Sequence, residues 1–126
     1  MAKETPLDVW GRFVMENLRD PGIFHVDGLL ASHWKAPSHK ELQALLGTLS
    51  EAQRGLVRRA FIASLDYAIH DFLFALQEQS DNDGPVRIRV RGKNVAALSD
   101  GLQGELFTED GWYARFSKHG EPPENS

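Results

Sequence analysis

The chain has 126 residues, no cysteine, a formal net charge of −4 at pH 7, and ordinary fractions of hydrophobic (41%) and charged (25%) residues. These values are typical of one globular domain, and the absence of cysteine excludes a disulfide framework and thiolate chemistry. No stretch resembles a signal peptide or a membrane span, and the acidic balance disfavours a general nucleic-acid binder. We therefore expect one cytoplasmic domain over residues 1–119 and a disordered polar tail, 120–126.

The N-terminal part begins with a helix signal and ends in a stretch without a regular period. Thr5 followed by Pro6 predicts an N-cap and a first helical turn. Apolar residues then recur at helical spacing until Asp-Pro-Gly at 20–22, which predicts the end of that helix. Residues 23–37 are interrupted by glycine and proline, so the sequence predicts no conformation for them.

Two capping boxes predict the next helices. Ser38 with Glu41 predicts the start of a short helix, and Ser50 with Gln53 predicts the start of a long one over about residues 51–79. Because the middle of the long helix is apolar on nearly all sides, we expect it to be packed on several sides at the centre of the fold.

Small residues form a stripe along this long helix: Ala60, Ser64, Ala68 and Ala75. Side chains of this size allow two backbones to come close together. The stripe therefore predicts a close approach by another element of the chain.

After a polar break at 80–85 the hydrophobic period changes from helical to two. Val86, Ile88 and Val90 alternate with arginines, which predicts a strand whose apolar face lies on the long helix. Further apolar segments predict partner strands at about residues 95–98 and 112–117. Helices followed by a small antiparallel sheet over about residues 86–117 predict an α+β fold.

The first candidate site is a row of positive charge on the predicted strand. Arg87, Arg89 and Arg91 occupy alternate positions, and Lys93 lies near the expected turn. Alternate side chains of a strand project from one face, and guanidinium groups bind carboxylates and phosphates in a bidentate manner. The row predicts a surface for a protein partner with an acidic face; nucleic acid is the weaker alternative, because no aromatic residue lies within the row. The other alternative is a solvated face or a charged edge strand.

The second candidate site is a polar stripe on the long helix. Arg59, Asp66 and His70 are seven and four residues apart, so they share one face. In a small enzyme, His70 would act as a general base, Asp66 would orient its imidazole, and Arg59 would hold an anionic group. The alternative is structural, because polar residues on packed helices usually satisfy one another.

The third candidate site is the segment 25–39, which contains three histidines, Asp27 and Trp34. Trp34 would anchor a binding interface if it is exposed, and would anchor the segment on the core if it is buried. His25 and Asp27 would share one face of an extended chain, but no third ligand follows at a suitable spacing. The sequence therefore predicts no metal site.

No phosphate-binding loop, dinucleotide fingerprint or catalytic signature occurs in the sequence, and we expect no cofactor. The leading hypothesis is a small protein-binding module, such as an inhibitor or immunity-type protein that neutralises its partner. The alternatives are a small enzyme that uses Asp66 and His70, and a nucleic-acid-associated factor. The sequence predicts neither the identity of the partner nor the oligomeric state.

Overall fold

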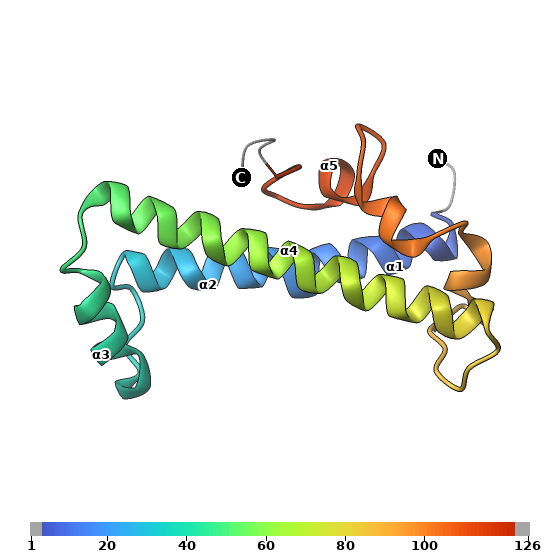
Figure 1. The fold of residues 1–126 in the computed structure, drawn as a ribbon, viewed down its shortest axis with the longest axis horizontal. Helices are drawn as coiled ribbons and strands as arrows, with labels where there is room; N and C mark the ends of the chain where they lie inside the picture. Colours follow the sequence, from blue (N-terminus) through green and yellow to red (C-terminus); the bar gives the residue numbers. More distant parts are fainter. Residues whose placement is uncertain (1–3, 123–126) are drawn as a thin grey trace.

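The computed structural model describes residues 4–122, which form an elongated helical hairpin with a smaller layer on part of one side (Figure 1). One arm is a helical rod made of α1, η1 and α2, and the other arm is the long helix α4, antiparallel to the rod. The elements are α1 (Pro6–Val14), η1 (Met15–Arg19), α2 (Asp20–Leu30), α3 (Pro37–Leu46), α4 (Glu51–Asp81), β1 (Arg89–Val90), β2 (Lys93–Asn94), η2 (Val95–Leu98), η3 (Leu102–Leu106) and α5 (Trp112–Phe116). The smaller layer consists of the segments after α4, from β1 to α5, and it covers the half of the hairpin that contains α1.

The rod continues through residues 20–22, so the predicted end of the first helix is wrong. Pro21 has no N–H, and in a regular α-helix its ring would clash with the carbonyl four residues earlier. The preceding turn, η1, is a π-helix in which the Asp20 N–H donates to the Met15 carbonyl, five residues back. This wider turn accommodates the proline, and α2 then extends into the segment for which the sequence predicts no conformation.

Two of the predicted helix caps are confirmed. The Thr5 hydroxyl accepts a hydrogen bond from the Asp8 N–H at 3.1 Å. Ser50 and Gln53 form the predicted capping box at the start of α4, with each side chain bonded to the backbone N–H of the other residue. The long helix ends at Asp81, close to its predicted end.

The capping box predicted at Ser38 is wrong. The N-cap of α3 is Ala36, two residues before the predicted cap, and it forms no side-chain hydrogen bond; the helix begins at Pro37. Proline suits the first helical turn, because a backbone N–H there would have no acceptor within the helix and its absence costs nothing. The Ser38 hydroxyl instead lies 3.0 Å from Nδ1 of His39.

Helix α4 is less enclosed than its sequence predicts. Its buried residues lie on one side, namely Ile69, Leu73, Leu76 and Gln77. Large apolar side chains on its other sides are exposed: Leu56 (59%), Tyr67 (69%), Phe72 (51%) and Phe74 (45%). The prediction of one long central helix is confirmed, since α4 contacts α2, η2 and η3. The helix is not enclosed on nearly all sides, because the smaller layer covers only part of the hairpin. Neither α4 nor another helix within residues 4–122 has the length and apolar content needed to cross a membrane.

The stripe of small residues on α4 is exposed as well. Ala60, Ser64, Ala68 and Ala75 all face solvent. Within residues 4–122 no element makes the close approach that the stripe predicts, so this prediction is wrong for the single chain.

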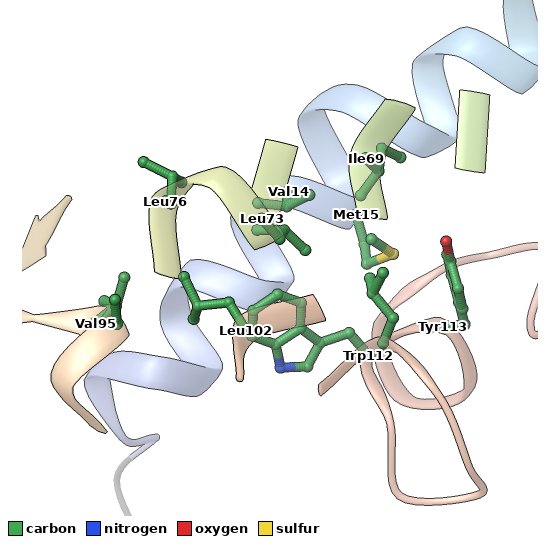
Figure 2. Packing of buried hydrophobic residues seen from close by; sticks show 11 residues of the cluster. Val14, Met15, Ile69, Leu73, Leu76, Val95, Leu102, Trp112 and Tyr113 are labelled. Atoms are coloured by element: carbon green, nitrogen blue, oxygen red, sulfur yellow. The ribbon is translucent and has the colours of Figure 1, made fainter. Parts of the chain in front are cut away.

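The main hydrophobic core lies between α1, η1, the second half of α4 and the smaller layer (Figure 2). Its buried members are Val14, Met15, Ile69, Leu73, Leu76, Val95, Ala96, Leu102, Leu106, Trp112 and Tyr113. Trp112 is fully buried, and its indole lies directly on Gly11, where a Cβ atom would overlap the ring. The absence of a side chain at Gly11 therefore allows Trp112 to pack closely on α1.

The C-terminal part contains both sheet and helix, which confirms the α+β class, but the sheet is shorter than predicted. It consists of β1 and β2, paired antiparallel. The segments predicted as further strands are the 3₁₀-helix η2 and the helix α5. Local capping favours η2, where the Asn94 side chain accepts from the Ala96 N–H, whereas α5 has no side-chain cap. Ile88 and Val90 pack against the core, whereas Val86 is exposed. The sequence predicts that this strand lies on the long helix, but the main helix contact of β1 is with α1.

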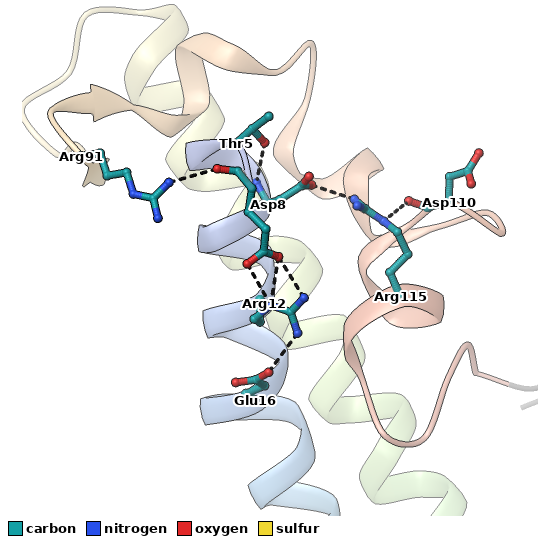
Figure 3. A network of polar contacts seen from close by, with 8 residues as sticks. Thr5, Asp8, Arg12, Glu16, Arg91, Asp110 and Arg115 are labelled. Atoms are coloured by element: carbon teal, nitrogen blue, oxygen red, sulfur yellow. Dashed lines mark hydrogen bonds and ion pairs between the residues drawn. The ribbon is translucent and has the colours of Figure 1, made fainter. Parts of the chain in front are cut away.

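Polar contacts attach the start of α1 to the smaller layer (Figure 3). Arg115 of α5 donates to the Asp8 carboxylate at 2.8 Å and to the Asp110 carbonyl at 2.7 Å. Arg91 donates to the Glu4 carbonyl at 3.0 Å. The β-hairpin, α1 and α5 are therefore held together at this end of the molecule.

Candidate functional site

The predicted basic row is built as a tight β-hairpin and not as one face of a long strand. Val90 pairs with Lys93, so these two side chains share a face, and Arg89 points to the opposite face. Arg91 and Gly92 form the turn, with φ angles of 52° and 78°. Two successive positive φ values are typical of the tightest hairpin turns. The four cations therefore do not form a single ladder.

Two arginines of the hairpin are used inside the chain. Arg87 donates to the Gln79 carbonyl in the last turn of α4 and to the Gly84 carbonyl in the loop that follows, and it forms an ion pair with Asp83 at 3.2 Å. Arg91 donates to the Glu4 carbonyl (Figure 3). These contacts fix the position of the hairpin relative to α4 and α1.

Arg89 and Lys93, unlike Arg87 and Arg91, have no side-chain polar contact inside the described part of the chain. Both are exposed, and neither makes a side-chain hydrogen bond or an ion pair within residues 4–122. Arg89 is the one arginine in this part of the chain without such a contact. The binding role of the four hairpin cations stays a prediction, and these two are its most accessible members.

Trp34 anchors the segment between α2 and α3. Its indole N–H donates to the His25 carbonyl at 3.0 Å, and its ring lies on Gly28, where a Cβ atom would overlap it. The buried Gln43 side chain bonds both the N–H and the carbonyl of Trp34, each at 2.9 Å. Of the two roles expected for this half-buried tryptophan, these contacts support the structural anchor.

Histidine rings gather around this tryptophan. His25 stacks on Trp34 with ring centroids 5.3 Å apart, and His39 meets His25 edge-on at 5.0 Å. Within residues 4–122 no group of three or more histidine, cysteine or acidic side chains is arranged to hold a metal ion.

Asp66 and His70 share a face of α4, but the carboxylate is bound elsewhere. Both Asp66 oxygens accept from Arg19, at 2.8 and 3.2 Å. The imidazole Nδ1 of His70 lies 3.3 Å from the carboxylate of Asp71, on a side chain that is 39% exposed. Arg59 is exposed and takes part in an interaction of its own. An acid–base role for Asp66 and His70 stays a prediction, and the Arg19 contacts weigh against Asp66 as the residue that orients His70.

Arg19 is a buried charged residue whose importance the sequence did not indicate. Its side chain is 1% exposed and also donates through Nη1 to the Ser117 hydroxyl at 2.8 Å and to the Gly120 carbonyl at 2.7 Å. Its guanidinium carbon lies 4.3 Å from the centre of the Tyr113 ring. Its partners are 47 or more residues away in sequence, so no local pattern could have indicated them.

Asp20 completes this buried network. Its carboxylate accepts from the Ser117 hydroxyl at 2.6 Å and from the Lys118 N–H at 3.1 and 3.2 Å. The chain is therefore held against the rod as far as Gly120, the first residue of the predicted tail; residues 123–126 lie outside the described part.

Tyr113 lies beside the network in a buried position. Burial raises the pKa of its hydroxyl above the usual value, because the phenolate is poorly solvated there. The negative charge of Asp66 raises it further, and the positive charge of Arg19 opposes the shift.

Two grooves border the segment that Arg19 holds. The larger, of about 800 Å³, lies along the rod between Phe24 and Phe116. The smaller, of about 420 Å³, lies along α4, where Tyr67 and His70 face Phe107. As far as the described residues line them, neither groove contains a serine or threonine hydroxyl that could act as a nucleophile.

Comparisons of the chain with models of protein families, with curated proteins and with solved structures found no significant match. A function is therefore proposed from the side chains themselves. Arg89, Lys93 and the exposed apolar surface of α4 are among the features for which the described residues show no internal role.

Proposed function

We propose that this chain is a small cytoplasmic protein-binding module that neutralises a partner protein, in the manner of an inhibitor or immunity-type protein. Arg89 carries the proposal. Every other arginine within residues 4–122 has an interaction inside the chain, whereas Arg89 is exposed on the β-hairpin without one. Guanidinium groups form strong bidentate bonds with carboxylates, so the expected partner presents an acidic face.

The surroundings of Arg89 support a protein as the partner. Lys93 is a second exposed cation on the same hairpin, on the face opposite to Arg89. Val86 and Leu98, from the segments on either side, are about half exposed. Arginine and apolar side chains are both common in protein interfaces, whereas nucleic-acid sites combine several cations with aromatic stacking.

The hairpin is also held in place before any partner binds. Arg91 ties its turn to Glu4, and Arg87 closes the loop that leads into it. A surface ordered in advance loses less conformational entropy on association, which favours affinity.

The test is affinity capture from a lysate of the source cells with wild type, Arg89→Glu and Lys93→Glu. Lys40→Glu, an exposed lysine on α3 at the other end of the molecule, is the matched control for charge. We expect wild type and Lys40→Glu to retain one stoichiometric acidic protein and Arg89→Glu to lose it; Lys93→Glu, on the opposite face of the hairpin, should weaken capture less. Retention by all four forms would remove the hairpin from binding, and capture of nucleic acid alone, lost after nuclease treatment, would contradict a protein partner.

A further inference from the structure

One exposed stripe of α4 has the spacing of a coiled-coil seam. Its residues are Leu56, Ala60, Ala63, Tyr67, His70 and Phe74, separated by four, three, four, three and four residues. This alternation places them in one row along a helix and is the pattern of two helices that pack side by side. Five of the six are exposed, and His70 is partly so. The buried side of α4, which contains Ile69 and Leu73, faces a different direction.

We propose that this seam binds a second copy of the same chain, with the two α4 helices antiparallel about a two-fold axis at Leu65. The seam is symmetric about that position in residue number. Leu56 and Phe74 lie nine residues on either side of it, Ala60 and His70 five, and Ala63 and Tyr67 two. An antiparallel pair centred there brings the two members of each set opposite each other across the interface.

Side-chain size favours this orientation. In the antiparallel register, the bulky Tyr67 faces Ala63 of the second copy, and His70 faces Ala60. Large residues opposite small ones fill a helix interface without voids or overlap. A parallel pair would place Tyr67 against Tyr67 and Ala63 against Ala63, so some layers would be too full and others empty.

The surface area of the chain is consistent with an uncovered interface. Its accessible surface is 8172 Å². A folded monomer of 14.1 kDa is expected to expose about 6,700 Å². The elongated shape contributes to the difference, roughly 1,500 Å², which leaves room for the ~800 Å² that each partner covers in an interface of standard size. Two hairpins joined in this way would form a four-helix arrangement, which encloses apolar surface that one hairpin leaves exposed.

The smaller groove lies next to the seam. Ala63, Tyr67 and His70 form one wall, and Phe107, which is 45% exposed, belongs to the opposite one. This hollow gives a seam side chain of the second copy a place to insert beside α4. Self-association here leaves Arg89 and Lys93 free for another protein, so it goes beyond the proposed function and does not depend on it.

The first test measures the molar mass of the purified wild-type chain by light scattering over a range of concentrations, together with Ala63→Glu and Ala68→Glu. Both substitutions introduce the same charge on an exposed alanine of α4, but Ala68 is five residues from Ala63, which turns it about 140° round the helix and away from the seam. We expect wild type and Ala68→Glu to be dimeric. Ala63→Glu should raise the dimer dissociation constant about 100-fold. The two-fold dimer contains the substituted residue twice, and each copy should weaken binding roughly tenfold. A monomeric wild type, or a dimer disrupted by Ala68→Glu and not by Ala63→Glu, would overturn the proposal.

The second test reads the orientation by disulfide cross-linking, which is clean because the chain has no cysteine of its own. An equal mixture of Leu56→Cys and Phe74→Cys chains should form a mixed disulfide dimer on oxidation. Leu56→Cys alone should not cross-link, because its two sulfur atoms would lie about 27 Å apart along the antiparallel pair. The reverse pattern would indicate a parallel dimer and contradict the register about Leu65. Neither outcome bears on the binding of a different protein through Arg89.

Discussion

Replacing Arg19 by methionine should strongly destabilise the fold, because it removes the centre of the buried polar network. The side chain is 1% exposed and bonds both oxygens of Asp66, whose side chain is itself only 12% exposed. Arg19→Met leaves that carboxylate buried without its cation and breaks the bonds to Ser117 and Gly120. Methionine is long enough to keep much of the packing on Tyr113, so the electrostatic loss dominates.

The size of the effect follows from the loss of one partner of a buried ion pair, about 3–5 kcal/mol. For a domain of this length, a loss of that size corresponds to a fall of roughly 10–20 °C in melting temperature. Urea unfolding followed by circular dichroism gives the free energy of unfolding, and an unchanged m-value would show that the same surface is exposed on unfolding.

Arg12→Met is the matched control, since Arg12 also contacts two carboxylates, Glu4 and Glu16, but on an exposed surface (Figure 3). Its ion pairs are screened by water, so its loss should be much smaller than that of Arg19. The double variant Arg19→Met with Asp66→Leu should recover part of the stability, because it removes the stranded charge as well. Equal losses for Arg19→Met and Arg12→Met would refute the role given to the buried network.

Three further predictions concern stability. Gly55→Ala should stabilise α4 by about 0.5–1 kcal/mol, since the added Cβ would meet no neighbouring side chain within 4 Å. Gly11→Ala should destabilise the fold by about 1–3 kcal/mol, because its Cβ would overlap Trp112. Thermal unfolding of both variants measures the two effects. Ser50→Ala removes the capping box of α4 and should lower the free energy of unfolding by about 1 kcal/mol, and a loss within error would mean that the cap is replaced by water. Stability should fall above about pH 10, because the tyrosine proton is then released from the unfolded chain but is still held by Tyr113 in the folded chain, where its pKa is raised. Tyr113→Phe should weaken this dependence of stability on pH. The same pH profile in the variant would contradict the prediction.

Local signals in the sequence determined the elements that depend on neighbouring residues. The caps at Thr5 and Ser50 and the length of α4 were predicted because the groups that form them lie within a few residues of each other. The change of period after α4 correctly indicated a hairpin and an α+β fold. Its extent was overestimated, because short apolar runs such as Val95–Leu98 fit a strand or a 3₁₀ turn equally well.

The tertiary structure decided everything that depends on distant residues. A proline that locally signals a helix end is accommodated at Pro21 by a π turn, and the rod that results packs along α4. An apolar sequence cannot show which sides of α4 will be covered, since that depends on where the smaller layer lies. Arg19 finds Asp66, Ser117 and Gly120 only in the folded chain, and the same folding leaves Arg89 facing solvent. The sequence by itself determined where charge and apolar surface exist, and packing determined which of them are available to another molecule.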